Sequence, residues 1–283
     1  MKINPLFPIK QEIDMKDVDE LLNPSQPVFQ ANPDITFKKA FFLGEDFGKE
    51  IHAEIIKNYA GIEAITKVNY NKKDKLVKGS NDFYCVAVNE EFRKRNLKIR
   101  TATQADLERI LRESLLELSG HYEDSGLVLR NKQEPNSYFA NDLFSQFKTQ
   151  GINLKENTAY VINLHNLSLR KDNSPPCKLS FNLPSLIANI TDGYFEAPIL
   201  NIASQQKFDS SDIEVKTGIP AKVSATGSRI LYTRNFASYP IKSSGVSRLY
   251  LNGGLGLYSG SVNLPSSDDD GRVVCVSGEA SAL

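Results

Sequence analysis

The sequence contains no tryptophan, and only three histidines, three cysteines and two methionines occur among its 283 residues. The cysteines, Cys85, Cys177 and Cys275, are odd in number, widely spaced and not arranged as C-x-x-C. This spacing indicates neither a disulfide framework nor a zinc site. We therefore expect three free thiols in a reducing compartment.

Long apolar runs are also missing. No run approaches the roughly 18 to 20 residues needed to cross a bilayer, and residues 1–5 do not begin the apolar stretch of a signal peptide. The sequence predicts a soluble protein without membrane insertion or a signal peptide, and it leaves the location, in the cytoplasm or on a virion, open.

Neither sign of charge is in excess, because 34 basic residues balance 34 acidic ones. Nucleic acids and anionic membranes attract proteins that carry a positive field, and this chain has no such field overall. Hydrophobic residues make up 40% of the chain, which is enough for a substantial core. We expect a globular protein with no nucleic-acid partner.

Catalytic motifs are absent as well. The chain has no nucleophile elbow, no metal-binding histidine pair and no glycine loop that opens a helix. The histidines, His52, His121 and His165, are scattered. His121 could bind a cation with Glu123 and Asp124, but it directly follows the end of a predicted helix. We predict that the protein is not an enzyme and has no catalytic residues, no metal site and no cofactor.

Hydrophobic periodicity predicts three amphipathic helices, in which apolar residues recur at every third or fourth position. Thr103 followed by Asp106 predicts a capping-box-like start for the second helix. The predicted helices cover residues 41–60, 104–118 and 138–149.

Short apolar runs bounded by turn residues predict strands. The first two of these runs flank a basic turn at residues 72–75, and the others follow residue 151. The predicted strands cover residues 64–70, 83–88, 159–164, 178–183, 197–202, 215–223 and 229–233.

The order of these elements predicts an α+β fold, with helices in the first half and short strands in the second. The first 35 residues hold five prolines and show little periodicity, which is typical of an extended arm. We divide the chain into residues 1–95, an N-terminal arm with a helix-and-strand supporting region, and residues 96–283, a ligand-binding domain.

The segment 247–276 interleaves two sets of residues. Leucines and valines alternate with small, polar or tyrosyl residues, which predicts a hairpin with one buried face and a tight turn at residues 252–254. The buried framework set is Leu249, Leu251, Leu255, Leu257, Leu264, Val273, Val274 and Val276. The outward set, which we predict to bind a ligand, is Tyr250, Asn252, Gly253, Gly254, Gly256, Tyr258, Gly260, Ser261, Ser266, Asp268, Asp269 and Asp270.

The composition of this segment is restricted. Between Ser243 and Gly278 there is no Lys, Glu, Gln, Met or Trp. No codon for these five types ends in a pyrimidine. Replacing the adenines of an AAC or AAT codon while keeping its last base yields Asn, Tyr, Ser, Asp and Gly, among others, but never those five. The segment therefore has the composition expected of adenine-directed mutagenesis.

At these residues the chain resembles the variable proteins of diversity-generating retroelements, whose C-terminal region is rewritten by error-prone reverse transcription. The run Gly271-Arg272-Val273-Val274 is similar to the ending of that family, although the aromatic residue often found before the arginine is absent. The resemblance covers about the last 40 residues. It implies a C-type lectin-like domain with short strands, two helices and long loops, in which variable side chains on a fixed backbone bind a protein or cell-surface ligand.

The chemistry of the outward set favours the same function. Tyrosine brings a large contact area with few rotatable bonds, and Ser, Gly, Asn and Asp supply adaptable hydrogen bonds, as in antibody loops. Two other functions stay open at this point: a structural virion or appendage protein without a ligand, and a lectin-fold enzyme resembling the formylglycine-generating group. The triplet Asp268–Asp270 could also hold calcium, and Cys275 is either a small buried residue or a variable position.

Overall fold

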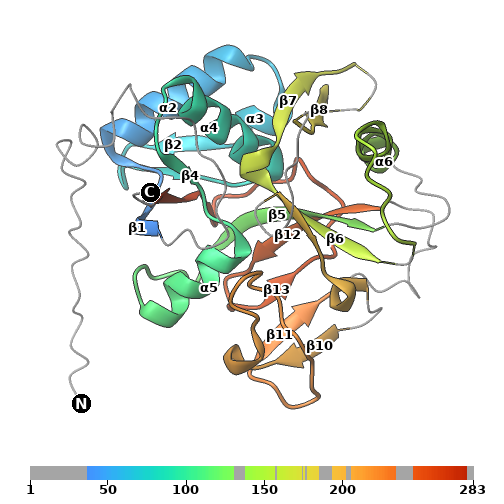
Figure 1. Ribbon diagram of the computed structural model, residues 1–283. Coiled ribbons are helices and arrows are strands. Elements are labelled where there is room, and N and C mark those ends of the chain that lie inside the picture. Colours follow the sequence, from blue (N-terminus) through green and yellow to red (C-terminus); the bar gives the residue numbers. More distant parts are fainter. Residues whose placement is uncertain are drawn as a thin grey trace, which may run out of the picture.

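The computed structural model of the chain describes residues 37–130, 138–156, 158–173, 175, 177–184, 193–201, 205–233 and 245–278. The predicted N-terminal arm lies outside these residues. Within them, helices and strands alternate in a mixed α+β order (Figure 1). None of the helices that are described is long and apolar enough to span a bilayer.

Five α-helices and three short 3-10 helices are described. In Figure 1, α2, α3 and α4 lie together above the central strands, whereas α5 and α6 lie on opposite sides of the molecule. The helices are α2 (Glu45–Asn58), α3 (Glu63–Thr66), α4 (Asp82–Lys94), α5 (Gln104–Glu113), α6 (Tyr138–Thr149), η1 (Leu164–Asn166), η2 (Pro198–Asn201) and η3 (Ser210–Asp212).

The largest sheet has the strand order β10-β11-β13-β12-β5-β14-β3-β2, and β6 also pairs with β5 and with β9. Strand β5 lies at its centre, because β12 pairs along one edge while β14 and β6 share the other edge. The strands are β2 (Asn69–Asn71), β3 (Leu76–Lys78), β5 (Tyr122–Arg130), β6 (Ala159–Asn163), β9 (Tyr194–Glu196), β10 (Gln205–Phe208), β11 (Arg229–Tyr232), β12 (Val246–Leu251), β13 (Leu257–Tyr258) and β14 (Gly271–Arg272).

Two smaller sheets complete the structure. One has the order β1-β15-β4, so the first described strand is paired with the last, and the other is the hairpin β7-β8. Strands on both sides of residue 95 therefore pair with each other, β1 with β15 and β3 with β14. The strands are β1 (Phe37–Phe42), β4 (Ile99–Thr101), β7 (Ser168–Lys171), β8 (Leu179–Asn182) and β15 (Val274–Gly278).

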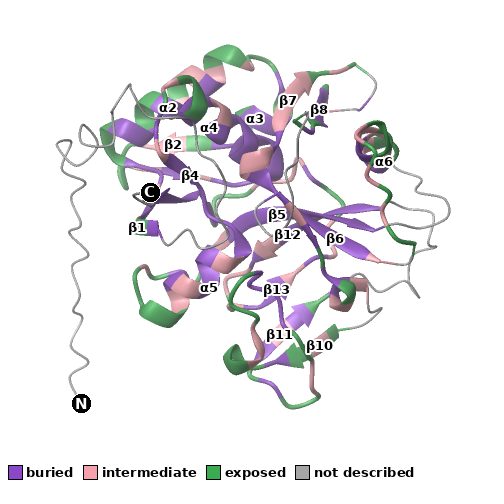
Figure 2. Cartoon of the chain, viewed as in Figure 1, coloured by how far each residue is buried: buried purple, intermediate pink, exposed green. Residues whose placement is uncertain are grey.

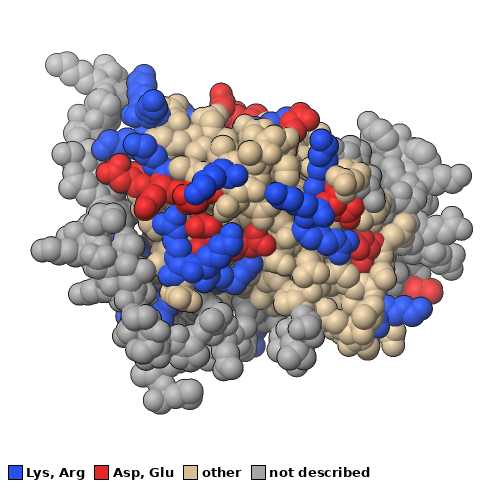
Figure 3. All heavy atoms as spheres, turned by 90° about the horizontal axis from the view of Figure 1, so that it is seen from above, with Lys and Arg blue, Asp and Glu red and all other residues tan. Residues whose placement is uncertain are grey.

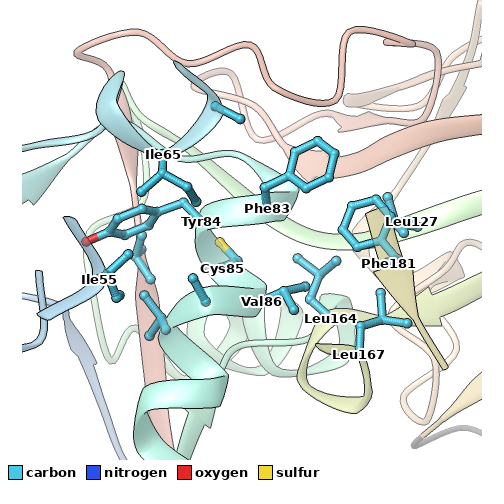
Figure 4. Packing of buried hydrophobic residues seen from close by; sticks show 14 of the residues in the cluster. Ile55, Ile65, Phe83, Tyr84, Cys85, Val86, Leu127, Leu164, Leu167 and Phe181 are labelled. Carbon is cyan, nitrogen blue, oxygen red and sulfur yellow. The ribbon is translucent and has the colours of Figure 1, made fainter. Parts of the chain in front are cut away.

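Helix α4 replaces the strand predicted at residues 83–88, and this prediction was wrong. The helix is buried on all sides at this run, so its apolar residues show no helical periodicity that would distinguish it from a buried strand. Asn81 caps its start by accepting a hydrogen bond from the Tyr84 amide at 2.9 Å. Phe83 stacks on Phe181 with ring centroids 4.5 Å apart, while Tyr84 points toward Ile55 (Figure 4).

The three predicted helices are present, with differences in the bounds of two of them. Helix α6 has the predicted bounds, and the capping box between Thr103 and Asp106 at the start of α5 is confirmed, although α5 ends at Glu113 rather than at residue 118. Helix α2 starts later than predicted, because Phe41 and Phe42 belong to β1.

The short strands are confirmed in part. Strands β6, β8 and β11 lie within the predicted runs. The predictions for residues 64–70, 197–202 and 215–223 were wrong in whole or part, because α3 occupies the first run up to Thr66, η2 occupies most of the second, and the third forms turns rather than a named strand. Ile202 lies outside the described residues. The central strand β5, whose last eight residues are all buried, was not predicted (Figure 2).

Candidate ligand-binding surface

Three neighbouring strands present tyrosines on one face of the large sheet and leucines on the other. The register pairs Tyr232 with Tyr258 and Tyr258 with Tyr250 across β11, β13 and β12. The residues beside them, Leu231, Leu257 and Leu251, are fully buried. Because successive side chains of a strand point to opposite faces, the leucines anchor the sheet while the tyrosines face outward.

The tyrosines form a continuous aromatic row. Ring centroids are 5.1 Å apart for Tyr232 and Tyr258, and 5.4 Å apart for Tyr258 and Tyr250. Tyr122 of β5 extends the row, with its centroid 5.9 Å from that of Tyr250 in an edge-to-face arrangement. Tyr232 is 37% exposed and the other three are half-buried. Four strands thus contribute one ring each to a single surface.

The aspartate triplet lies at the Tyr122 end of this row. The Tyr122 hydroxyl accepts a hydrogen bond from the Asp268 amide at 3.0 Å, and the Tyr122 amide donates to the Asp270 carbonyl at 3.3 Å. Arg272 donates to the Asp269 carbonyl at 2.7 Å. The loop backbone is therefore tied to β5 and β14, while the three carboxylates are exposed. We call the four tyrosines and Asp268–Asp270 the tyrosine–aspartate surface.

A buried ion pair lies next to two of these rings. Arg248 of β12 donates from Nε and Nη2 to the two carboxylate oxygens of Asp124, each at 2.7 Å, and from Nη1 to the Ser266 carbonyl at 3.0 Å. Its guanidinium carbon lies 5.3 Å from the Tyr122 ring centroid and 5.1 Å from that of Tyr250. Arg248 thereby supports two rings of the row and the loop that carries the aspartates.

Burial shifts the ionisation of several groups around this pair. Burial alone would lower the pKa of Arg248, but its contacts with Asp124 outweigh that effect, so the pKa is raised and the guanidinium stays charged. Burial, with a contribution from Asp124, raises the pKa of Asp82 well above its usual range. Neither carboxyl oxygen of Asp82 has a hydrogen-bond partner among the described residues. Burial also raises the pKa of Tyr122 and Tyr250, so both phenols are protonated at neutral pH.

Some of the predicted ligand-binding residues build the turn between β12 and β13 instead. The Asn252 side chain accepts a hydrogen bond from the Gly256 amide at 2.7 Å, and the Gly253 carbonyl accepts one from Gly120 at 2.9 Å. Gly256 is buried rather than outward, which corrects its predicted placement. A Cβ atom there would lie 2.9 Å from the Ile230 carbonyl oxygen, so only glycine fits without a shift.

The remaining predicted residues lie around the surface. Gly254 is exposed at the tip of the turn, and Gly260, Ser261 and Ser266 are half-buried. The Ser261 carbonyl accepts a hydrogen bond from the Arg248 amide at 2.8 Å. The predicted burial of the framework set is confirmed except at Leu255, which lies in the turn with a positive φ of 60° and is half-buried.

Three contributors to the site were not predicted. Tyr122 and Tyr232 lie outside the segment 247–276, and Arg248 lies within it but was assigned to neither set. The signal for Tyr232 was present, because it alternates with the buried Leu231 in a predicted strand. Tyr122 gave no comparable signal, since its strand was not predicted.

Metal binding and thiol chemistry are the remaining possibilities at the predicted residues. Among the residues that the structure describes, no group of three or more His, Cys, Asp or Glu side chains is arranged to hold a metal ion. All three cysteines are free, as predicted, and Cys275 is fully buried on β15. Burial raises the pKa of Cys85, Cys177 and Cys275, which keeps the thiols protonated and poorly nucleophilic.

Charges of both signs are mixed on the surface seen from above. Figure 3 shows lysines and arginines lying next to aspartates and glutamates rather than gathering in a patch of one sign.

Comparison of the chain with protein-family models, curated proteins and solved structures finds no match.

Gly271 is expected to be indispensable for the position of the aspartate loop. A Cβ atom on it would lie 2.5 Å from the Ser80 nitrogen and 2.7 Å from the Tyr122 ring. We expect Gly271→Ala to lower the free energy of unfolding by about 1 to 3 kcal/mol, because the backbone must shift to accept the methyl group. Urea denaturation measures this change. Gly254→Ala is the matched control, since its Cβ would meet its nearest neighbour at 3.7 Å, and equal effects of the two substitutions would contradict the packing.

Proposed function

We propose that the chain is a non-enzymatic ligand-binding protein with a C-type lectin-like domain, in which the part of the tyrosine–aspartate surface that belongs to the segment 247–276 is diversified by a retroelement through adenine mutagenesis. The aromatic row carries this proposal. Tyr250 and Tyr258 of the segment 247–276 lie side by side on one face and continue into Tyr122 and Tyr232. Aromatic side chains grouped at a surface are typical of protein binding sites.

The division between framework and surface supports diversification. Leu251 and Leu257 are fully buried next to outward tyrosines, and Arg248 and Arg272 are buried while the aspartates between them are exposed. Side chains that point away from the core can change with little effect on the fold. The restricted composition of residues 243–278 supports adenine mutagenesis as the source of such changes.

The mixed α+β order, with short strands and long connections, is compatible with a C-type lectin-like domain. Protonated thiols and the lack of a metal-binding group among the described residues favour binding over a lectin-fold enzyme that depends on a reactive cysteine or a metal.

The encoding DNA tests the proposal. We expect a near-copy repeat beside a reverse transcriptase gene, with adenines opposite the codons for Tyr250, Tyr258 and Asp268–Asp270. In sibling genes, we expect differences at these outward-facing positions and none at Leu251 or Gly256. Sequencing of the locus and of its siblings measures both. Differences spread evenly along the chain, or a locus without a repeat, would contradict diversification.

A further inference from the structure

In the C-terminal segment the basic side chains are buried and the acidic side chains are exposed. Among residues 245–278 the basic side chains are Arg248 and Arg272, which are 5% and 7% exposed. Arg248 is bonded to Asp124, and Arg272 to two backbone carbonyls. The acidic side chains of the same segment, Asp268–Asp270, are all exposed. The segment therefore presents only negative charge to a ligand.

The exposed carboxylates are not neutralised by the lysines of strand β3 and of the turn before it. No ion pair joins any of the three to another residue in the part of the chain that is described. Lys78, next to Arg272 in the register, is paired with Asp74, and Lys75 is paired with Glu45. The neighbour of Asp269 is the neutral Asn69, whose Nδ2 lies 3.4 Å from an Asp269 oxygen.

The aromatic row adds a second element that suits cations. Arg248 already packs against Tyr122 and Tyr250 from inside the protein, which shows that these rings accept a guanidinium. The row continues through Tyr258 to Tyr232 in steps of 5.4 Å and 5.1 Å, and is therefore longer than a single small ligand needs. A lysine or arginine can lay its aliphatic stem on a ring and place its charged head near a carboxylate.

We infer that the ligand of the tyrosine–aspartate surface is a protein segment that carries lysine or arginine side chains, an inference that rests on the proposed binding function. Charge complementarity selects this class of ligand over acidic or neutral segments. The carboxylates attract its basic residues, and the tyrosines supply the contact area.

Selection from a random peptide library on the full-length chain tests this inference. We expect the selected peptides to be enriched in Lys and Arg and to bind less tightly as salt is raised. Replacing the triplet with Asn (Asp268→Asn, Asp269→Asn, Asp270→Asn) should weaken their binding about tenfold or more, since three surface charge pairs are lost. Tyr258→Ser and Tyr232→Ser, made separately and checked for folding by thermal unfolding, should each weaken it about tenfold.

A variant with the same change in net charge serves as the control. Asp46→Asn, Glu50→Gln and Glu63→Gln remove three exposed carboxylates from α2 and α3 and should leave binding unchanged. If peptides lose binding to the tyrosine variants but keep it to the variant with Asn at positions 268–270, the inference of a cationic ligand would be overturned, whereas the proposed binding surface would stand. A library that yields no binder, or binders unaffected by either set of substitutions, would overturn both.

Discussion

Replacing Arg248 with methionine is expected to destabilise the protein by about 3 to 5 kcal/mol. The substitution keeps an unbranched apolar stem but leaves the Asp124 carboxylate buried without its partner. An uncompensated buried charge carries a cost of this size. Asp82, whose pKa is raised by burial and by Asp124, lies in the same cluster and offers no compensating positive charge. Denaturant unfolding at neutral pH measures the loss.

Two further variants separate the charge from the packing. Combining Arg248→Met with Asp124→Asn should recover at least half of the lost stability, because no buried charge is then unpaired. Arg112→Met, at a side chain that is 53% exposed, should change stability by about 0.5 kcal/mol or less. If Arg248→Met costs less than about 1 kcal/mol, or if the double variant is as unstable as the single one, the buried pair does not support the surface as described.

Replacing Glu123 with glutamine is expected to stabilise the protein by about 3 kcal/mol at pH 7. Glu123 is 1% exposed, and neither of its carboxyl oxygens has a hydrogen-bond partner among the described residues. Burial, with a contribution from Asp124 and against the opposing effect of Arg272, raises its pKa from 4.5 to about 9. The folded protein must therefore hold a proton that the unfolded chain releases at neutral pH.

The stabilisation by Glu123→Gln depends on pH because the folded state of the wild type binds the Glu123 proton more tightly than the unfolded state does. Below pH 4.5 both states are protonated, so wild type and Glu123→Gln should be equally stable. Between that pH and about 9, wild type loses up to about 1.4 kcal/mol per pH unit from this group, which amounts to about 3 kcal/mol at pH 7. Glutamine cannot ionise and avoids the loss.

Unfolding curves of the two proteins at pH 4 and at several values up to pH 9 give this difference directly. Glu156→Gln is the control, because Glu156 is exposed and its replacement should change stability by about 0.5 kcal/mol or less at every pH. A difference between wild type and Glu123→Gln that stays constant with pH would show that Glu123 ionises normally in the folded protein.

Local patterns predicted several elements because the relevant interactions are close in sequence. The capping box of α5 joins Thr103 to a residue three positions later, and the bounds of α6 follow its apolar periodicity. Helix α4 was missed for the opposite reason. Its apolar run is buried on all sides by elements far along the chain, such as Phe181 of β8, and such burial removes the periodicity on which the prediction depends.

Part of the candidate surface was also accessible to local reasoning. The alternation of Leu251 and Leu257 with Tyr250 and Tyr258 follows from the period of a β-strand, and the structure has the leucines inside. Alternation alone did not reveal that Gly256 is buried, because the group that leaves no room for a side chain is the carbonyl of Ile230 on another strand.

The amino-acid order of residues 247–276 was sufficient to separate an apolar framework from tyrosines, glycines and aspartates, since a strand sorts its side chains by position alone. Which of these residues share a surface depended on strand pairing. Tyr122 and Tyr232 join the row because β5 and β11 lie in the same sheet as β12 and β13. For the same reason, Arg248 of β12 forms its ion pair with Asp124 of β5. Such partners are far apart in the chain, and only the packing of the whole sheet brings them within bonding distance.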